Sequence, residues 1–308
     1  MAQSTASLRI GTRGSPLALV QARAVRARLA MATGMNEDGI ELVVIRTSGD
    51  TIQDRPLAEE GGKGLFTKEI DEALLDGRID LAVHSAKDMP TVLPPGLTLS
   101  ACLEREDPRD VFISRKARTL SELPKGASLG TASLRRQAIA MRARPDLLVR
   151  PLRGNVETRL RKLEAGDVDA TLLALAGLKR LGLTKHATCI MSADEFLPAV
   201  GQGAIGIEAR ESDRRMREIL THINHADTLT TVHCERAFLA ALDGSCRTPI
   251  AGHATIAGNA VQFRGLIARS DGSVAHDVAG TGNRADATTI GTEAGRELRH
   301  RAGPGFFD

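Results

Sequence analysis

Lys87 and Asp88 are the residues of this 308-residue chain whose positions most clearly indicate chemistry. They follow the apolar run Leu81–Val83, which predicts a buried strand, and they precede Pro90, which stops any helix that follows. In an open α/β sheet, ligands bind beyond the carboxyl ends of the strands. We therefore expect Lys87 and Asp88 to point into a cleft, and a solvated surface ion pair is the alternative.

Arginines recur at equivalent places, beside predicted helix starts. Arg13 precedes a predicted helix for which Ser15 is a good N-cap and Pro16 suits the first position. Arg135 and Arg136 open another predicted helix, where cations oppose the helix dipole, so an anion between them would resolve the conflict. The other arginines near predicted helices are Arg153, Arg159 and Arg180. Because Arg binds carboxylates through a planar, bidentate fork, the set indicates a ligand with carboxylates.

The elements that must position these residues form a predicted α/β framework. Strands are expected at residues 8–11, 41–47, 81–83 and 97–102, with helices at 15–32 and 66–75. After the charged connector 104–110, strands are expected at 111–114, 128–131, 147–150 and 169–174, with helices at 133–144 and 158–165. The second unit thus repeats the opening design of strand, polar turn and helix.

Gly201, Gly203 and Gly206 have the G-x-G-x-x-G spacing of a dinucleotide fingerprint. That motif must open a helix, whereas residues 204–209 alternate like a strand, so a nucleotide-dependent oxidoreductase is disfavoured. We interpret the segment as a crossover that returns the chain to the first unit. Helices at 211–217, 230–242 and 285–301 and strands at 253–257, 261–268 and 273–278 complete the chain and predict a small C-terminal α+β domain.

The composition argues against several functional classes. Hydrophobic residues make up 42% and charged residues 26%, as in globular proteins. Seven Phe with no Trp or Tyr argue against recognition of nucleic acid by base stacking. The 41 basic residues include only eight Lys, an excess of Arg that a GC-rich genome also explains. No signal peptide is visible at Met1–Ser7 and no apolar run is long enough to cross a bilayer, so we expect a cytoplasmic protein.

The four cysteines are far apart and include no C-x-x-C pair, as is usual for reduced thiols in the cytosol. Cys102, Cys189 and Cys234 have apolar or helical contexts and are predicted to be packing residues. Cys246 differs, because it lies in a glycine-flanked loop beside Arg247, a setting that favours the thiolate.

Two other patterns resemble known site types but lack a required feature. His222, His225, His233 and Cys234 suggest zinc, yet their helical setting and the missing pair of cysteines argue against a metal site. Residues 51–64 are polar and glycine-rich and are expected to form a mobile loop that covers a cleft. Lys63 is followed by Gly64, so this loop is no phosphate-binding P-loop.

Nine segments carry a resemblance to a known family. In order they are GTRGSPLAL, GGKGLF, DLAVHSAKDMP, EREDPRD, GTASLRRQ, LRGNVETRL, LAGLKRLGL, LPAVGQGA and the GSC loop. From about Leu8 to Pro249 the chain resembles the porphobilinogen deaminase (hydroxymethylbilane synthase) family. From Gly252 onward the resemblance is only architectural.

The resemblance implies an α/β protein of three domains. Two periplasmic-binding-protein-like α/β domains would enclose a cleft, and a small C-terminal α+β domain with an antiparallel sheet would carry the cofactor-attachment cysteine. The expected boundaries are 1–103 with 204–226, 104–203, and 227–308. A cytoplasmic monomer is expected, with the small molecule porphobilinogen as substrate and no nucleic acid or membrane as partner.

The resemblance also implies a transferase of tetrapyrrole (haem, porphyrin) biosynthesis. It would condense four porphobilinogens head to tail, release ammonia at each step and free linear hydroxymethylbilane by hydrolysis. A dipyrromethane cofactor would be attached to Cys246 by a thioether. Asp88 matches the catalytic carboxylate, which would stabilise positive charge on a pyrrole ring. The matching cofactor- and substrate-binding positions are Arg13, Ser15, Lys63, Ser85, Lys87, Thr131, Ser133, Arg135, Arg136, Arg153, Arg159, Arg180 and Gln202.

Three positions depart from the family pattern. Ala132 stands where Ser is common, Glu157 lies close to two of the arginines, and Val20 replaces an aromatic residue of some members. The competing hypothesis is a non-catalytic binding protein or ligand-sensing regulator on the same two-domain scaffold. Such a protein would need neither a nucleophilic Cys246 nor a third domain.

Overall fold

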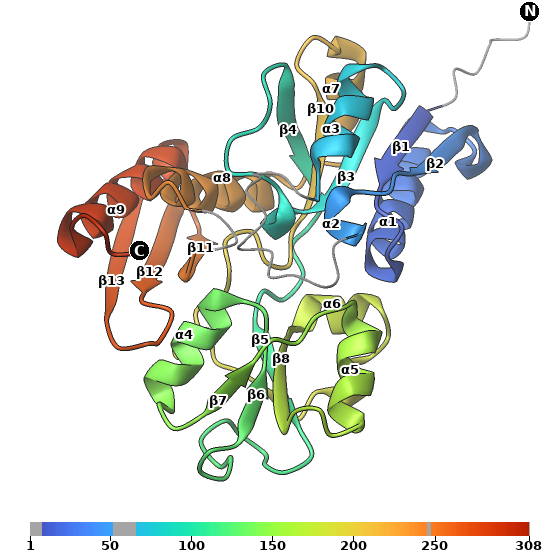
Figure 1. Cartoon of the computed structure of the whole chain (residues 1–308). Helices are drawn as coiled ribbons and strands as arrows, with labels where there is room; N and C mark the ends of the chain where they lie inside the picture. The colour runs from blue at the N-terminus through green and yellow to red at the C-terminus, as the bar shows by residue number, and fades with distance from the viewer. Residues whose placement is uncertain (1–7, 52–65, 245–247, 308) are drawn as a thin grey trace, which may run out of the picture. The chain divides into compact units, whose positions relative to one another are not determined.

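The computed structural model of the chain describes residues 8–51, 66–244 and 248–307. The chain divides into two compact units, Met1–Arg105 with Ala204–Leu229 (unit 1) and Glu106–Gly203 with Thr230–Asp308 (unit 2). Three sheets are present in the described residues, two of five strands and one of three strands (Figure 1). The α/β fold class with a small antiparallel sheet is therefore as expected.

Unit 1 contains a mixed sheet with the strand order β2-β1-β3-β10-β4. β1 lies parallel to β2 and β3, whereas β10 lies antiparallel to both β3 and β4. The strands are β1 (Leu8–Thr12), β2 (Ile40–Val44), β3 (Leu81–Ser85), β4 (Leu97–Cys102) and β10 (Ile205–Arg210). The helices are α1 (Pro16–Thr33), α2 (Ser48–Thr51), α3 (Lys68–Leu75) and α7 (Arg214–Thr221), with 3-10 turns at Glu37–Gly39 and Ala86–Asp88.

The two faces of the unit 1 sheet bury different helices, because successive side chains of a strand point to opposite faces. Leu81 and Val83 of β3 belong to a core with apolar residues of α1 and α7. Ala82 belongs to a second core with residues of α3. By the same alternation, β3 directs His84 towards the α3 face and Ser85 towards the α1 face.

Unit 2 contains a second mixed sheet, with the order β7-β6-β8-β5-β9. Here β6 lies parallel to β7 and β8, and β5 lies antiparallel to β8 and β9, so the pairing pattern of unit 1 recurs. The repeated strand–turn–helix design is therefore confirmed. The strands are β5 (Asp110–Ser114), β6 (Ser128–Gly130), β7 (Leu148–Arg150), β8 (Ala170–Ala174) and β9 (Cys189–Ile190). The helices are α4 (Leu134–Ala143), α5 (Val156–Glu164) and α6 (Leu175–Arg180), with a 3-10 turn at Thr184–His186.

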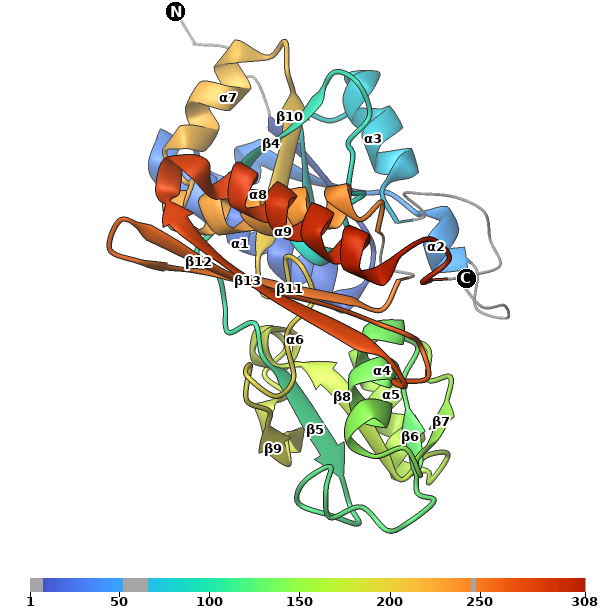
Figure 2. The ribbon, with the colours of Figure 1, turned by 90° about the vertical axis from the view of Figure 1, so that its left-hand side faces the viewer.

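The C-terminal part is an antiparallel meander, β11 (Ile250–Ala257), β12 (Ala260–Ala268) and β13 (Ala275–Asn283). Two helices, α8 (Ala226–Ala241) and α9 (Ala287–Ala302), lie over one face of this sheet, and a 3-10 turn at Arg284–Asp286 precedes α9 (Figure 2). The helices approach closely at Gly291, where a Cβ atom would come within 2.0 Å of the Cys234 carbonyl oxygen. Only a glycine permits this contact.

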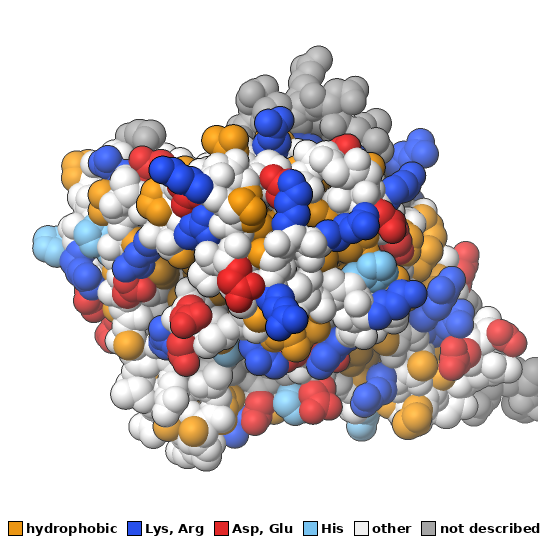
Figure 3. All heavy atoms as spheres, turned by 90° about the horizontal axis from the view of Figure 1, so that it is seen from below, with side chains coloured by type: hydrophobic (Ala, Val, Ile, Leu, Met, Phe, Trp, Pro, Cys, Tyr) orange, Lys and Arg blue, Asp and Glu red, His pale blue; other side chains and the backbone are white. Residues whose placement is uncertain are grey.

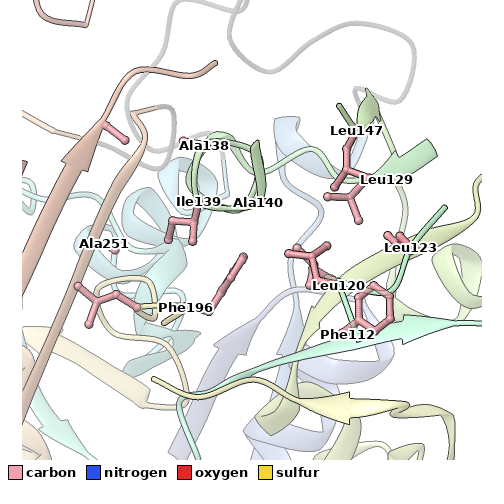
Figure 4. Packing of buried hydrophobic residues seen from close by; sticks show 14 of the residues in the cluster. Phe112, Leu120, Leu123, Leu129, Ala138, Ile139, Ala140, Leu147, Phe196 and Ala251 are labelled. Atoms are coloured by element: carbon pink, nitrogen blue, oxygen red, sulfur yellow. The ribbon is translucent and has the colours of Figure 1, made fainter. Parts of the chain in front are cut away.

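One apolar core joins the second sheet to the third. Phe112 and Phe196 pack in the same cluster as Ala251 and Leu266 of the antiparallel sheet, and Figure 4 shows part of this packing. This shared core explains why residues 106–203 and 230–308 form one compact unit. Each of the three predicted domains contains one sheet, and their division at residues 103, 203 and 226 stays a prediction.

Some local expectations were wrong at their edges. The strand expected at 41–47 ends at Val44, and β3 continues to Ser85 rather than ending at Val83. The short elements α6 and β9 were not predicted, because six and two residues are too few to show a period. The expected loop 51–64 lies almost wholly outside the described residues.

Charged side chains of both signs are interspersed on the face drawn in Figure 3, in keeping with a net charge of +3. In the described part of the chain, no helix combines the length and the apolar character needed to cross a membrane.

Candidate functional site

Asp88 ends a short 3-10 turn that directly follows the central strand of unit 1. β3 lies between β1 and β10, and the turn Ala86–Asp88 begins where β3 ends. Met89 then has extended backbone angles (φ −72°, ψ 144°), as the following Pro90 requires. Asp88 and Lys87 are therefore held beyond the carboxyl end of a strand, and both side chains are half-buried.

A small cavity of about 80 Å³ within unit 1 brings Asp88 together with three other predicted site residues. These three are Arg13, Ser15 and Ser85. The remaining lining residues are Leu17, Ala18, Gln21, Phe66, Val83 and His84. One carboxylate and one guanidinium thus share a cavity whose wall is partly apolar.

The junction of β1 and α1 supplies the cationic side of this cavity. Ser15 caps α1, because its Oγ accepts a hydrogen bond of 3.3 Å from the Ala18 backbone N–H, and Pro16 occupies the first helical position. The guanidinium carbon of Arg13 lies 4.3 Å from the centre of the Phe66 ring, which is a cation–π contact. A helix N-terminus beside a positioned Arg is favourable for an anion.

Gln21, which was not among the predicted site residues, supports Ser85 on the α1 face of the sheet. Gln21 Nε2 donates a hydrogen bond of 2.8 Å to Ser85 Oγ, and Gln21 is only 2% exposed. The sequence contains a sign that Gln21 is buried. It lies one turn before Val25 and two turns before Leu29, in the row of residues that α1 buries. A glutamine in such a row requires a polar partner.

In unit 2, the anion expected between Arg135 and Arg136 is supplied by the chain itself. Asp110, at the start of β5, is 0% exposed, and its Oδ2 lies 2.8 Å from Nη2 of Arg135. Asp110 Oδ1 accepts hydrogen bonds from Nη2 (2.7 Å) and Nε (3.0 Å) of Arg136. Asp110 ends the EREDPRD connector but was not among the predicted site residues.

This buried cluster keeps an excess of positive charge. Two guanidinium groups face one carboxylate, and burial lowers the pKa of Arg135. Burial alone would raise the pKa of Asp110, but the charges of Arg135 and Arg136 lower it overall. Arg135 Nε has no hydrogen-bond partner among the described residues. The cluster therefore carries one positive charge more than its own carboxylate balances.

The polar residues predicted nearby also have roles inside unit 2. Thr131 Oγ1 accepts a hydrogen bond of 3.1 Å from the Ser133 N–H, and Ser133 Oγ in turn caps α4 by accepting from the Arg136 N–H at 3.4 Å. Gln202 Nε2 donates to Asp110 Oδ1 at 3.2 Å. These side chains therefore organise the start of α4 around Asp110.

The other three predicted arginines lie in or just before helices α5 and α6 of unit 2. Arg159 Nε donates to the Gly154 carbonyl at 2.8 Å, and Arg180 Nη2 donates to the Gly203 carbonyl at 2.7 Å. Burial lowers the pKa of Arg180. Arg153 is half-buried in the turn between β7 and α5.

Lys63 and Cys246 lie outside the described residues. Of the other cysteines, Cys102 and Cys234 are buried and Cys189 is partly buried against the core of unit 2, as predicted for packing residues. Burial raises the pKa of the Cys234 thiol to about 12, which suppresses its reactivity. His225 Nδ1 forms a hydrogen bond of 2.8 Å with Thr228 Oγ1.

Comparisons with known proteins agree over nearly the whole chain. The family described as "Porphobilinogen deaminase, dipyromethane cofactor binding domain" matches residues 8–218, and "Porphobilinogen deaminase, C-terminal domain" matches residues 229–300. Two curated relatives named porphobilinogen deaminase, from Nitrobacter winogradskyi and Nitrobacter hamburgensis, are each 59% identical over 298 residues, covering 97% of this chain and 94% of each relative.

Solved structures of binding proteins are similar at a lower level. The methionine-binding protein MetQ is 12% identical with a TM-score of 0.46, covering 71% of this chain and 91% of that protein. A periplasmic substrate-binding protein of an ABC transporter from Coxiella burnetii is 16% identical with a TM-score of 0.42, covering 72% of this chain and 94% of that protein.

Proposed function

The chain belongs to the porphobilinogen deaminase family, and from this premise we propose that Asp88 is its catalytic carboxylate and Cys246 its cofactor-attachment residue. The enzyme is a transferase of tetrapyrrole biosynthesis that condenses four porphobilinogen molecules head to tail with loss of ammonia. Linear hydroxymethylbilane is then released by hydrolysis. The dipyrromethane cofactor is part of this family's active form.

The observation that carries the assignment of Asp88 is its place in the unit 1 cavity. The cavity combines this carboxylate with Arg13 and the capped start of α1. Condensation of pyrroles places positive charge on a ring, and a fixed carboxylate beside the ring nitrogen stabilises that charge. Asp88 can also hold a proton that the ring nitrogen gives up, and return it. Arg13 and the N–H groups of α1 would bind a substrate carboxylate.

The residues of unit 2 fit a cofactor that bears several carboxylates. Arg135 and Arg136 leave one positive charge uncompensated beside Asp110, and Arg135 Nε has no hydrogen-bond partner among the described residues. Further hydrogen-bond donors to the cofactor carboxylates would come from Arg153, Arg159 and Arg180. The start of α4 would be held in place by Thr131, Ser133 and Gln202. When bound, the dipyrromethane supplies the pyrrole end to which substrate units are added. The sulfur of Cys246 would hold it covalently through a thioether. We propose Lys63, Ser85 and Lys87 as further cofactor- or substrate-binding residues.

We further propose a division into three domains, 1–103 with 204–226, 104–203, and 227–308, and a monomer that acts in the cytoplasm. The three separate sheets support the division. Sedimentation equilibrium of the purified enzyme, with and without porphobilinogen, tests the oligomeric state.

Intact-mass measurement and a turnover assay together test the proposed site. The purified protein is expected to exceed its sequence mass by two pyrrole units and to convert porphobilinogen to a linear tetrapyrrole with release of ammonia. Peptide mapping should place the added mass on the peptide that contains Cys246. An active enzyme whose mass equals that of its sequence would refute the covalent attachment.

A further inference from the structure

Three ionisable side chains from three elements meet in the interior of unit 1. Asp71 of α3, His84 of β3 and Glu208 of β10 are 4%, 5% and 0% exposed. Each offers an oxygen or nitrogen atom, and these atoms all lie within 4.8 Å of one another. His84 Nε2 lies 3.4 Å from Glu208 Oε2. Charged residue types are almost never fully buried unless they are paired, so this cluster requires an explanation.

The sheet register explains how the three residues meet. Glu208 of β10 lies directly opposite Ala82 of β3, so both point to the same face, the one that α3 covers. His84 follows Ala82 by two residues and therefore also points to this face. Asp71 completes the cluster from the buried side of α3.

The cluster has too little positive charge among the described residues. Asp71 Oδ1, His84 Nε2 and both carboxylate oxygens of Glu208 have no hydrogen-bond partner there. The other charged side chains on the elements around the cluster either bind different partners or are exposed to solvent. Arg9 of β1 and Arg210 of β10 bind Asp80, Glu69 of α3 accepts from the Ser48 N–H, and Glu72 is exposed.

Two buried carboxylates without a cation are costly, and protons remove the cost. We propose that Asp71 and Glu208 share one proton and, with His84 beside them, act as positioning residues for the Ser85–Asp88 segment. The proton lies on the Asp71 carboxyl group and is donated to Glu208, whose Oε2 lies 3.4 Å from His84 Nε2. The shared proton thus leaves one negative charge in the cluster instead of two. The role in positioning rests on the function proposed above for Asp88.

The pKa of Asp71 agrees with a proton on this carboxyl group. Burial, followed by the negative charge of Glu208, raises the pKa of Asp71 to about 7. Asp71 therefore keeps its proton below neutral pH in the folded protein and loses it at higher pH.

The cluster can affect the reaction because β3 and the turn after it join His84 to Asp88. His84 precedes Asp88 by four residues, and both line the cavity of unit 1. A second negative charge in the cluster would repel Glu208 and displace the end of β3. A displacement of about 1 Å at reacting groups is sufficient to slow turnover roughly a hundredfold.

The test compares the kinetics of Asp71→Asn and His84→Leu with those of Glu72→Gln. Asp71→Asn keeps the shape and a donor but cannot ionise, so its kcat should stay constant up to pH 9, whereas the wild-type kcat should fall above pH 7 with KM unchanged. His84→Leu removes one donor and should lower kcat at pH 7 about tenfold or more. Glu72→Gln alters an exposed carboxylate on the same helix and should keep the wild-type profile. A wild-type profile in Asp71→Asn would overturn the positioning role.

Two measurements without substrate test the cluster independently of Asp88. A group with a raised pKa stabilises the fold below its unfolded pKa of about 4, and this stability is lost as the pH rises through about 7. Thermal unfolding should therefore show a smaller loss of Tm between pH 5 and 8 in Asp71→Asn than in the wild type. Metal analysis of the purified holoenzyme should find less than 0.1 equivalent of any divalent metal. An equal loss of Tm in both proteins would contradict the proposal that Asp71 is protonated in the cluster. So would one equivalent of bound metal in the wild type that is missing from Asp71→Asn.

Discussion

At the scale of single residues, Asp88 is the side chain on which turnover should depend most. Asp88→Asn keeps the shape of the side chain but removes its charge, so the positive ring would lose its stabilising partner. Loss of one preorganised electrostatic group typically costs about a hundredfold to a thousandfold in kcat. The variant should fold and retain its cofactor by intact mass. Asp76→Asn, at an exposed position after α3, is the control and should keep normal kcat. A fall of less than threefold in Asp88→Asn would remove Asp88 from the mechanism.

Cys246 should differ from the buried cysteines in a way that mass spectrometry detects. A thioether requires a sulfur nucleophile, so Cys246→Ser should fold but lack the added pyrrole mass and have no activity. Cys102→Ala and Cys234→Ala should keep the added mass, because both thiols are buried in the core. Each should lose about 1 kcal/mol of unfolding free energy as a small cavity forms. Finding the adduct on Cys102 or Cys234 would contradict the assignment.

At the scale of elements, the start of α4 depends on the buried ion cluster around Asp110. Arg136→Leu removes three hydrogen bonds, two to Asp110 and one of 2.9 Å to the Leu172 carbonyl. Breaking a buried ion pair typically costs about 3–5 kcal/mol, and urea unfolding should show a loss of this size. Arg142→Leu changes an exposed arginine on the same helix and should change stability by less than about 0.5 kcal/mol.

Measuring both the added mass and the urea unfolding of Arg136→Leu separates two roles of Arg136, binding of the cofactor and stabilisation of the fold. A protein that loses its cofactor but unfolds at the wild-type urea concentration would show that Arg136 serves only the ligand. A protein that unfolds early and still carries the added mass would show that it serves only the fold. We expect both losses, because the guanidinium neutralises Asp110 and is also one of the proposed cofactor-binding groups.

At the scale of the whole molecule, the second and third sheets should unfold together. Phe196 is 2% exposed and packs in the core that also contains Ala251 and Leu266. Phe196→Ala should cost about 3–5 kcal/mol. Hydrogen exchange should accelerate in β5–β8 and in β11–β13 by the same factor, while the strands of unit 1 keep their protection. Leu148→Ala, at a site that is 54% exposed, should leave both sheets unchanged. Faster exchange in only one of the two sheets would refute a cooperative unit 2.

The acid limit of stability should depend on carboxylates whose pKa is lowered by folding. The pKa of Asp169 falls to about 2, chiefly through its bond with Lys116 and then through bonds from Ser128. A lowered pKa stabilises the fold above the unfolded value, and this stability is lost as the pH falls from about 4 through about 2. Asp169→Asn should flatten the fall of Tm between pH 5 and 2. An unchanged fall would show that other groups control acid unfolding.

Local signals in the sequence determined much of the fold and the candidate site. Ser15 and Pro16 begin a helix, and Pro90 ends the turn that carries Asp88, because capping and fixed backbone angles act over a few residues. The periodicity of hydrophobic residues predicted most strands and helices, because it too is a property of a few consecutive residues. The order of the motifs determined the family, which the comparisons confirm.

Only the tertiary structure decided which distant residues become partners. The pairing of Arg136 with Asp110 spans 26 residues and that of Gln21 with Ser85 spans 64. The cluster of Asp71, His84 and Glu208 further requires that β10 return beside β3 in one register. A shift of one residue in that register would turn Glu208 to the opposite face of the sheet. Such contacts depend on strand order and register, which periodicity within a short segment does not specify.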